Sequence, residues 1–227
     1  MFLRTLIILL LLVSLKLTAQ QENQEVEFNL SLLQGDSKVS LGELFSADGK
    51  KYNLSTFKFF ISDPHFFKNG KELHPNSNEV QLVDFSEEKS PSWVWNYPID
   101  QEADSVSFNI GLSKEINTSG VYGGALDPTT GMYWTWNTGY IHLKIEGSFV
   151  SDEPSEFSYH LGGYLEPNAA IQKVGFALSN HKVYLELQLL DVISKLPFDS
   201  KLHLMQTGEE ASRLLKDIAN CIHLGKL

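Results

Sequence analysis

The 227-residue sequence contains one cysteine, Cys221, so no disulfide can form within the chain. Cys221 lies in an apolar stretch near the end of the sequence, which predicts a buried small hydrophobic residue rather than a nucleophile. Long apolar runs are equally scarce. The apolar run at residues 6–13 is much shorter than the roughly 20 residues that a membrane-spanning helix needs, and no later segment comes near that length. We therefore expect no transmembrane segment in the mature chain.

Standard catalytic and cofactor motifs are also missing. The sequence has no G-x-S-x-G, H-E-x-x-H, C-x-x-C or G-x-x-x-x-G-K pattern, and no G-x-G-x-x-G pattern. Its carboxylates fall mostly in turns and on the polar faces of strands, where solvation is a sufficient reason for them. The sequence therefore argues against an ordinary hydrolase, and we expect a protein that is not an enzyme.

Basic residues are few. The chain has 18 lysines and arginines against 28 acidic residues. Without Arg4 and Lys16, residues 21–227 keep 16 basic and 28 acidic residues, a formal charge of −12. This charge disfavours nucleic acid and anionic membranes as partners.

The start of the chain has the pattern of a secretory signal peptide. Arg4 precedes the apolar run, and the small residue Ala19 precedes a polar segment. An uncleaved membrane anchor is the alternative, although the run is short for one. We predict cleavage near Ala19 or Gln20, which divides the chain into a signal peptide (1–20) and one exported, periplasmic or secreted domain (21–227).

Alternation of apolar and polar residues dominates that domain. It is clear in residues 25–32, 105–112, 140–147 and 182–190, and turn-like segments separate these runs. The pattern predicts an all-β fold, an antiparallel β-sandwich or barrel-like single domain. Helical spacing is convincing only in residues 208–222, which predicts a short C-terminal helix, and residues 191–196 could add a helical turn.

Histidines are the conventional candidates for metal ligands. His142 alternates with Lys144 and Glu146, so we predict that it faces solvent. His160 stands beside two glycines in F-S-Y-H-L-G-G, and His65 follows a proline at the end of an apolar strand. The other four carry little signal: His74, His181, His203 and His223. Without metal-ligand spacing, the residues themselves favour a structural role for each histidine.

The motif M-Y-W-T-W concentrates soft and aromatic side chains. If residues 132–136 are extended, then Met132, Trp134 and Trp136 point to one face. Such a face fits an aromatic core strand. It also fits a redox or soft-metal site, because a thioether suits cuprous copper. Trp93 and Trp95 have the same spacing, so the pair of tryptophans is not diagnostic in itself.

Residues 111–147, GLSKEINTSGVYGGALDPTTGMYWTWNTGYIHLKIEG, resemble the signature of the MbnP-like family, in the form common among Bacteroidetes. These are exported copper-binding proteins named from methanobactin operons. The resemblance extends to KFFISDPHFF, V-Q-L-V-D-F, F-S-Y-H-L-G-G and the closing K-D-I-A-N, in the family's order. It therefore covers essentially the whole mature chain.

The resemblance implies a β-rich periplasmic or secreted protein that binds copper through histidines. It further implies a tryptophan that a di-haem peroxidase-like partner oxidises to kynurenine. On this chain His160 becomes the best candidate ligand and His65 a weaker one, Trp134 or Trp136 the candidate for oxidation, and Met132 a candidate thioether. A metal-free β-sandwich module that binds a protein or glycan through the W-x-W surface remains the alternative.

Overall fold

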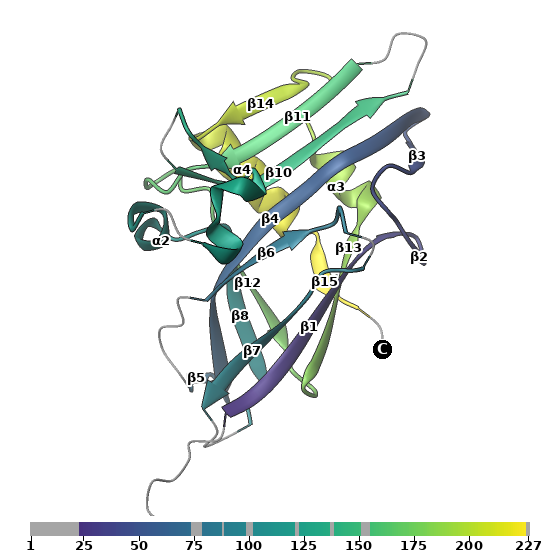
Figure 1. The fold of residues 1–227 in the computed structure, drawn as a ribbon. Coiled ribbons are helices and arrows are strands. Elements are labelled where there is room, and N and C mark those ends of the chain that lie inside the picture. The colour runs from purple at the N-terminus through teal and green to yellow at the C-terminus, as the bar shows by residue number, and fades with distance from the viewer. Residues whose placement is uncertain are drawn as a thin grey trace, which may run out of the picture.

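Two stacked β-sheets form the body of the protein, which we describe from a computed structural model (Figure 1). The structure describes residues 23–73, 79–87, 89–98, 102–120, 123–136, 139–150 and 155–225. The predicted signal peptide lies outside these residues, and so does His74.

The smaller sheet has five strands: β1 (Asn23–Gln34), β2 (Ser37–Lys38), β7 (Ser92–Pro98), β13 (Lys182–Gln188) and β15 (Ile222–Leu224). The larger sheet has ten: β3 (Leu44–Ala47), β4 (Lys50–Lys68), β5 (Lys71–Glu72), β6 (Val80–Asp84), β8 (Ser105–Ile110), β9 (Tyr133–Trp134), β10 (Gly139–Phe149), β11 (Ser155–Gly162), β12 (Gln172–Ala177) and β14 (His203–Gln206). The long strand β4 is central, since β3, β5, β6, β8 and β10 all pair with it.

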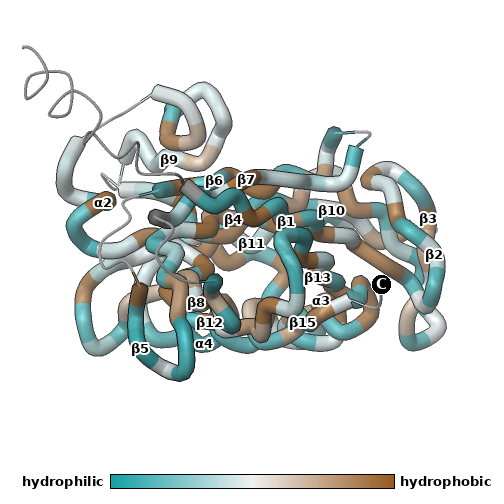
Figure 2. The backbone as a smooth tube through the Cα atoms, turned by 90° about the horizontal axis from the view of Figure 1, so that it is seen from below, coloured by the Kyte–Doolittle hydropathy of each residue, from teal (hydrophilic) through white to brown (hydrophobic). Residues whose placement is uncertain are grey.

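Aromatic side chains join the two sheets. Phe28 of β1 stacks on Trp93 and packs edge-on against Trp95, both from β7. Across the interface its ring lies 6.1 Å from that of Phe108 in β8. Figure 2 shows hydrophobic stretches around β4 in the middle of the molecule and hydrophilic stretches around β2 and β5 at its periphery. Trp93 and Trp95, the first of the two W-x-W pairs, therefore belong to the main core.

Helices are short and peripheral. They are α2 (Lys114–Thr118), α3 (Leu189–Lys195) and α4 (Glu209–Ala219), with 3-10 turns η1 (Gly124–Leu126) and η2 (Pro128–Thr130). The apolar stripe of α4, which includes Leu214, Leu215 and Ile218, is buried. Cys221, just after α4, is buried as predicted, and burial raises the pKa of its thiol. None of the helices in the described ranges is long and apolar enough to span a membrane.

The predicted β-sandwich with a C-terminal helix is confirmed, but the sheets are not purely antiparallel. β1 runs parallel to β13, and β11 runs parallel to β14. Both parallel pairs join strands that are far apart in sequence or separated by a crossover, and local alternation carries no information on strand direction.

Candidate functional site

The face of the large sheet that points away from the main core has an apolar half and a polar half. The segment from α2 to β9 covers the apolar half and encloses a second hydrophobic cluster: Phe60, Leu112, Ile116, Leu126, Met132, Trp134, Tyr140 and Ile141. The polar half follows β4, β10, β11 and β14, whose inward-pointing residues line the main core. We call this polar half the outer polar face.

His160 of β11 lies on the outer polar face and is only 8% exposed. It pairs with Lys144 of β10, and its ring Nε2 lies 2.7 Å from Oε1 of Glu146. Oε2 of Glu146 accepts a second hydrogen bond, from Thr56 Oγ1, at 2.8 Å. The carboxylate of Glu146 therefore fixes the orientation of the imidazole.

Burial lowers the pKa of His160, and the nearby Lys144 lowers it further, although the Glu146 carboxylate acts in the opposite direction. For Glu146, burial raises the pKa, but hydrogen bonds from Thr56 and His160 outweigh it and the pKa falls. The pair is thus a neutral imidazole beside an ionised carboxylate. With Nε2–H donating to Glu146, Nδ1 keeps its lone pair, and no hydrogen bond to it is found within the described part of the chain.

Strand β14 adds two side chains that the sequence did not single out as ligands. Met205 stands opposite His160, and His203 stands opposite Ser158, whose Oγ lies 2.8 Å from His203 Nδ1. Met205 is 46% exposed. A depression of about 540 Å³ beside this group is lined by Glu146, Ser158, His203 and Met205, together with residues 55, 147, 148, 156 and 157. The spacing H-x-M, which puts both side chains on one face of a strand, is the sequence signal that could have identified this pair.

The residues of M-Y-W-T-W separate in the structure. Met132 is 0% exposed inside the apolar cluster, whereas Trp136 is 67% exposed. Extended structure ends at Trp134, and a turn at residues 135 and 136 carries Trp136 outward. The rings of Trp134 and Trp136 remain close, with centroids 5.6 Å apart. The expected single face therefore holds for Met132 and Trp134 and not for Trp136.

Trp134 lies next to the outer polar face. A Cβ added to Gly162 would stand 2.8 Å from Cζ3 of its indole, so the indole lies directly over Gly162. Gly162 is two residues from His160 on the same side of β11. The structure thus brings Trp134 near His160, as expected.

His65 does not join this group. Lys58 of β4, Lys144 of β10 and His160 of β11 lie opposite one another across the sheet. His65 is seven residues beyond Lys58 along β4, which places it roughly 20 Å from His160. Its Nδ1 contacts Oε1 of Glu72 in β5. The prediction that His65 lies close enough to share a site with His160 is wrong, because β4 carries it to Glu72 of β5. In Figure 1, β5 and β11 lie at opposite ends of β4.

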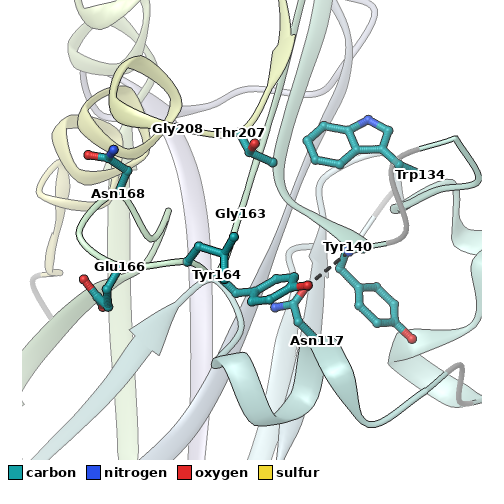
Figure 3. A pocket seen from close by; sticks show the side chains of 11 residues that line it. Asn117, Trp134, Tyr140, Gly163, Tyr164, Glu166, Asn168, Thr207 and Gly208 are labelled. Atoms are coloured by element: carbon teal, nitrogen blue, oxygen red, sulfur yellow. Dashed lines mark hydrogen bonds between the residues drawn. The ribbon is translucent and has the colours of Figure 1, made fainter.

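A pocket of about 360 Å³ opens beside Trp134 (Figure 3). Its wall includes Asn117, Tyr140, Tyr164 and Glu166, together with Gly139, Gly163, Leu165, Asn168, Thr207 and Gly208. The Nε1 of Trp134 is buried and has no hydrogen-bond partner among the described residues. The pocket therefore lies at the edge of the second hydrophobic cluster and is lined by both aromatic rings and side-chain amides.

The expectation that His142 faces solvent is wrong, since it is 0% exposed. A bulge between Ile141 and Leu143 turns it inward. Its Nδ1 lies 2.7 Å from the carbonyl oxygen of Ala170, and its Nε2 lies 2.9 Å from Asn117 Nδ2. Burial lowers the pKa of His142 to about 4. Both ring nitrogens are occupied, so His142 acts as a neutral structural link.

Within the described residues, no three or more histidine, cysteine, aspartate and glutamate side chains form a cluster that could hold a metal ion.

Comparison with known proteins places the chain. It resembles the solved structure of MbnP from Methylosinus trichosporium, with a TM-score of 0.58 and 17% identity over 76% of this chain and 78% of that one, which shows a shared fold. No curated protein matches. A family model described as MbnP matches residues 13–206. Because that match spans most of the sequence, the chain belongs to the MbnP family.

Proposed function

We propose that this protein is an exported, periplasmic or secreted copper-binding protein without catalytic turnover, which acts in copper acquisition, storage or delivery. The observation that carries the proposal is the pairing of His160 with Glu146 on the outer polar face. Histidines that ligate metals commonly donate their second ring N–H to a carboxylate, which fixes the tautomer and makes the free nitrogen a better donor.

The donors around His160 suit copper. Imidazole and thioether are ligands that copper accepts readily, whereas magnesium and calcium prefer oxygen. Burial keeps His160 neutral, and Glu146 holds its ring in place. The chain itself keeps the imidazole neutral and oriented. A bound copper ion would only coordinate to these donors.

The same proposal includes a di-haem peroxidase-like partner that, with peroxide as the oxidant, converts the indole of Trp134 or Trp136 to kynurenine and releases one carbon as formate. Exposure of Trp136 supports access by a partner protein, and the ring of the buried Trp134 lies only 5.6 Å from that of Trp136. Mass spectrometry of protein purified from its native host tests this step. A gain of about 4 Da, confined to a peptide that contains residue 134 or 136, is expected for conversion of indole to kynurenine.

Equilibrium copper titration of the purified protein tests the metal assignment. His160→Ala should weaken copper binding at least about tenfold, because it removes the oriented imidazole. His223→Ala, which removes an exposed histidine from β15 in the other sheet, is the matched control and should leave the affinity unchanged. Wild-type protein that binds no copper, before or after exposure to the oxidising partner, would contradict the proposal.

Export has a separate test. N-terminal sequencing of protein recovered from the periplasm or the medium should begin near residue 20. Protein in the membrane fraction that still begins with Met1 would contradict export.

The exposed indole favours a second candidate, a metal-free module that binds a protein or glycan. Trp136 offers a stacking surface, and the pocket beside Trp134 offers Glu166 and Asn168 as hydrogen-bonding groups. Ligand binding that Trp136→Ala abolishes, by a wild-type protein that takes up no copper, would favour this candidate.

A further inference from the structure

We propose that Met205 and His203 of β14 join His160 as the ligands of a cuprous site on the outer polar face. This inference rests on the proposed copper binding and goes further, because it names the ligand set and the oxidation state. It also moves the thioether from Met132, where the sequence suggested it, to Met205.

Strand register places the three side chains on the same face of two adjacent strands. β11 and β14 run parallel, with Ser158 opposite His203 and His160 opposite Met205. Adjacent strands are about 4.8 Å apart, so directly opposed side chains on one face touch readily and diagonal ones lie within reach of long side chains. Leu204, between His203 and Met205, is buried in the main core, which places its two neighbours on the opposite face.

Each imidazole is anchored through one nitrogen and keeps the other. His160 is held through Nε2 by Glu146, and His203 is held through Nδ1 by the hydroxyl of Ser158. With those N–H groups donating, Nδ1 of His160 and Nε2 of His203 carry the lone pairs that a metal ion requires. The two histidines are thus oriented by neighbours rather than by each other.

Met205 is placed as a ligand and Met132 is not. Met132 is fully enclosed by apolar side chains in the second cluster. Met205 is partly exposed on a polar face, next to His160 and at the edge of the depression that His203 also lines. A thioether is a soft donor that selects cuprous over cupric copper, so this set favours the monovalent ion.

The charges around the group do not oppose a cation. Lys58 pairs with Asp84 at 2.8 Å, and Lys144 lies 3.4 Å from the Glu146 carboxylate. Each lysine on this part of the face therefore has a carboxylate that compensates its charge.

Anaerobic titration with Cu(I), in competition with a colorimetric Cu(I) chelator, tests the ligand set. Met205→Leu and His203→Ala should each weaken Cu(I) binding at least about tenfold. Met132→Leu is the matched control, a change of the same type at a buried methionine, and should leave the affinity within about twofold. Circular dichroism of each variant checks that the fold is retained.

A second measurement reads the site directly. In protein labelled at the methionine methyl groups, the redox-inert probe Ag(I) should shift the NMR signal of Met205 and leave that of Met132 in place. Wild-type protein that binds Cu(I), with Met205→Leu and His203→Ala unchanged but His160→Ala weakened, would overturn this ligand set and leave the proposed function standing. Wild-type protein that binds no copper would overturn both.

Discussion

Asn117 and His142 meet in the interior, with 2.9 Å between the side-chain nitrogen of Asn117 and Nε2 of His142. The contact ties α2 to β10, and the other ring nitrogen of His142 ties β10 to Ala170. One neutral imidazole therefore joins three segments that are distant in sequence.

This burial predicts acid sensitivity. The pKa of His142 is about 4 in the folded protein and about 6.5 in the unfolded chain, so the unfolded chain takes up the proton first. The contribution of His142 to stability is complete above about pH 6.5 and decreases as the pH falls toward 4, by about 3 kcal/mol in total. Urea unfolding at about pH 7.5 and about pH 4.5 measures the change.

The control for this prediction is His142→Gln, which cannot titrate. Its free energy of unfolding should fall less than that of the wild type between the two pH values. His223→Gln, an exposed replacement, should behave like the wild type. Equal losses in wild type and His142→Gln would show that other groups cause the acid sensitivity.

Asn117→Ala should lower the free energy of unfolding by about 1 to 3 kcal/mol, since it leaves the buried Nε2 of His142 without its donor. Urea unfolding at neutral pH checks this value. Asn96→Ala, at an exposed position of β7, should change stability by less than about 0.5 kcal/mol. Similar effects of the two changes would mean that the hydrogen bonds of Asn117, including those with His142 and the Tyr140 N–H, contribute little.

Gly162→Ala should displace the indole of Trp134. The added Cβ would stand 2.6 Å from the carbonyl oxygen of Tyr140 and 2.8 Å from Trp134 Cζ3. We expect a loss of about 1 to 3 kcal/mol and a red shift of tryptophan fluorescence. Gly175→Ala, whose Cβ would meet only ordinary contacts at 3.6 and 3.8 Å, should leave the spectrum unchanged. An unshifted spectrum for Gly162→Ala would contradict the close fit of Trp134 over Gly162.

Glu146→Gln should weaken copper binding by about 10-fold to 100-fold, because an amide is a poorer acceptor for the N–H of His160 than a carboxylate. Competition titration measures the affinity. Asp84→Asn removes a carboxylate that pairs with Lys58 on the same face and should have a much smaller effect. Equal effects of the two changes would indicate a general influence of charge rather than orientation of His160.

Local pattern predicted the strands and the C-terminal helix well, because apolar alternation and helical spacing act within a few residues. The helix expected at 208–222 is α4, Glu209–Ala219, and the turn expected at 191–196 belongs to α3. The pairing partners of each strand could not be predicted from local pattern, because the register between distant strands is set only when the sheets assemble. The neighbours of His160, which are Glu146 on β10 and Met205 on β14, follow from that register alone.

Two predictions of side-chain orientation are wrong because strict alternation of apolar and polar residues takes no account of bulges and turns. The bulge at Ile141 and Leu143 reverses the side to which His142 points. The turn after Trp134 separates Trp136 from Met132 and Trp134. The bulge thus buries His142, and the turn exposes Trp136.

The parallel pairing of β1 with β13 also governs the order in which the chain can fold. β1 bonds to residues 182–188, so the smaller sheet stays incomplete until most of the chain has been synthesised. Contacts of such long sequence separation slow folding, because the loop must close before they stabilise anything. A chain that lacks β13 leaves one edge of β1 unpaired, so the smaller sheet is complete only when residues 182–188 have taken their place beside β1.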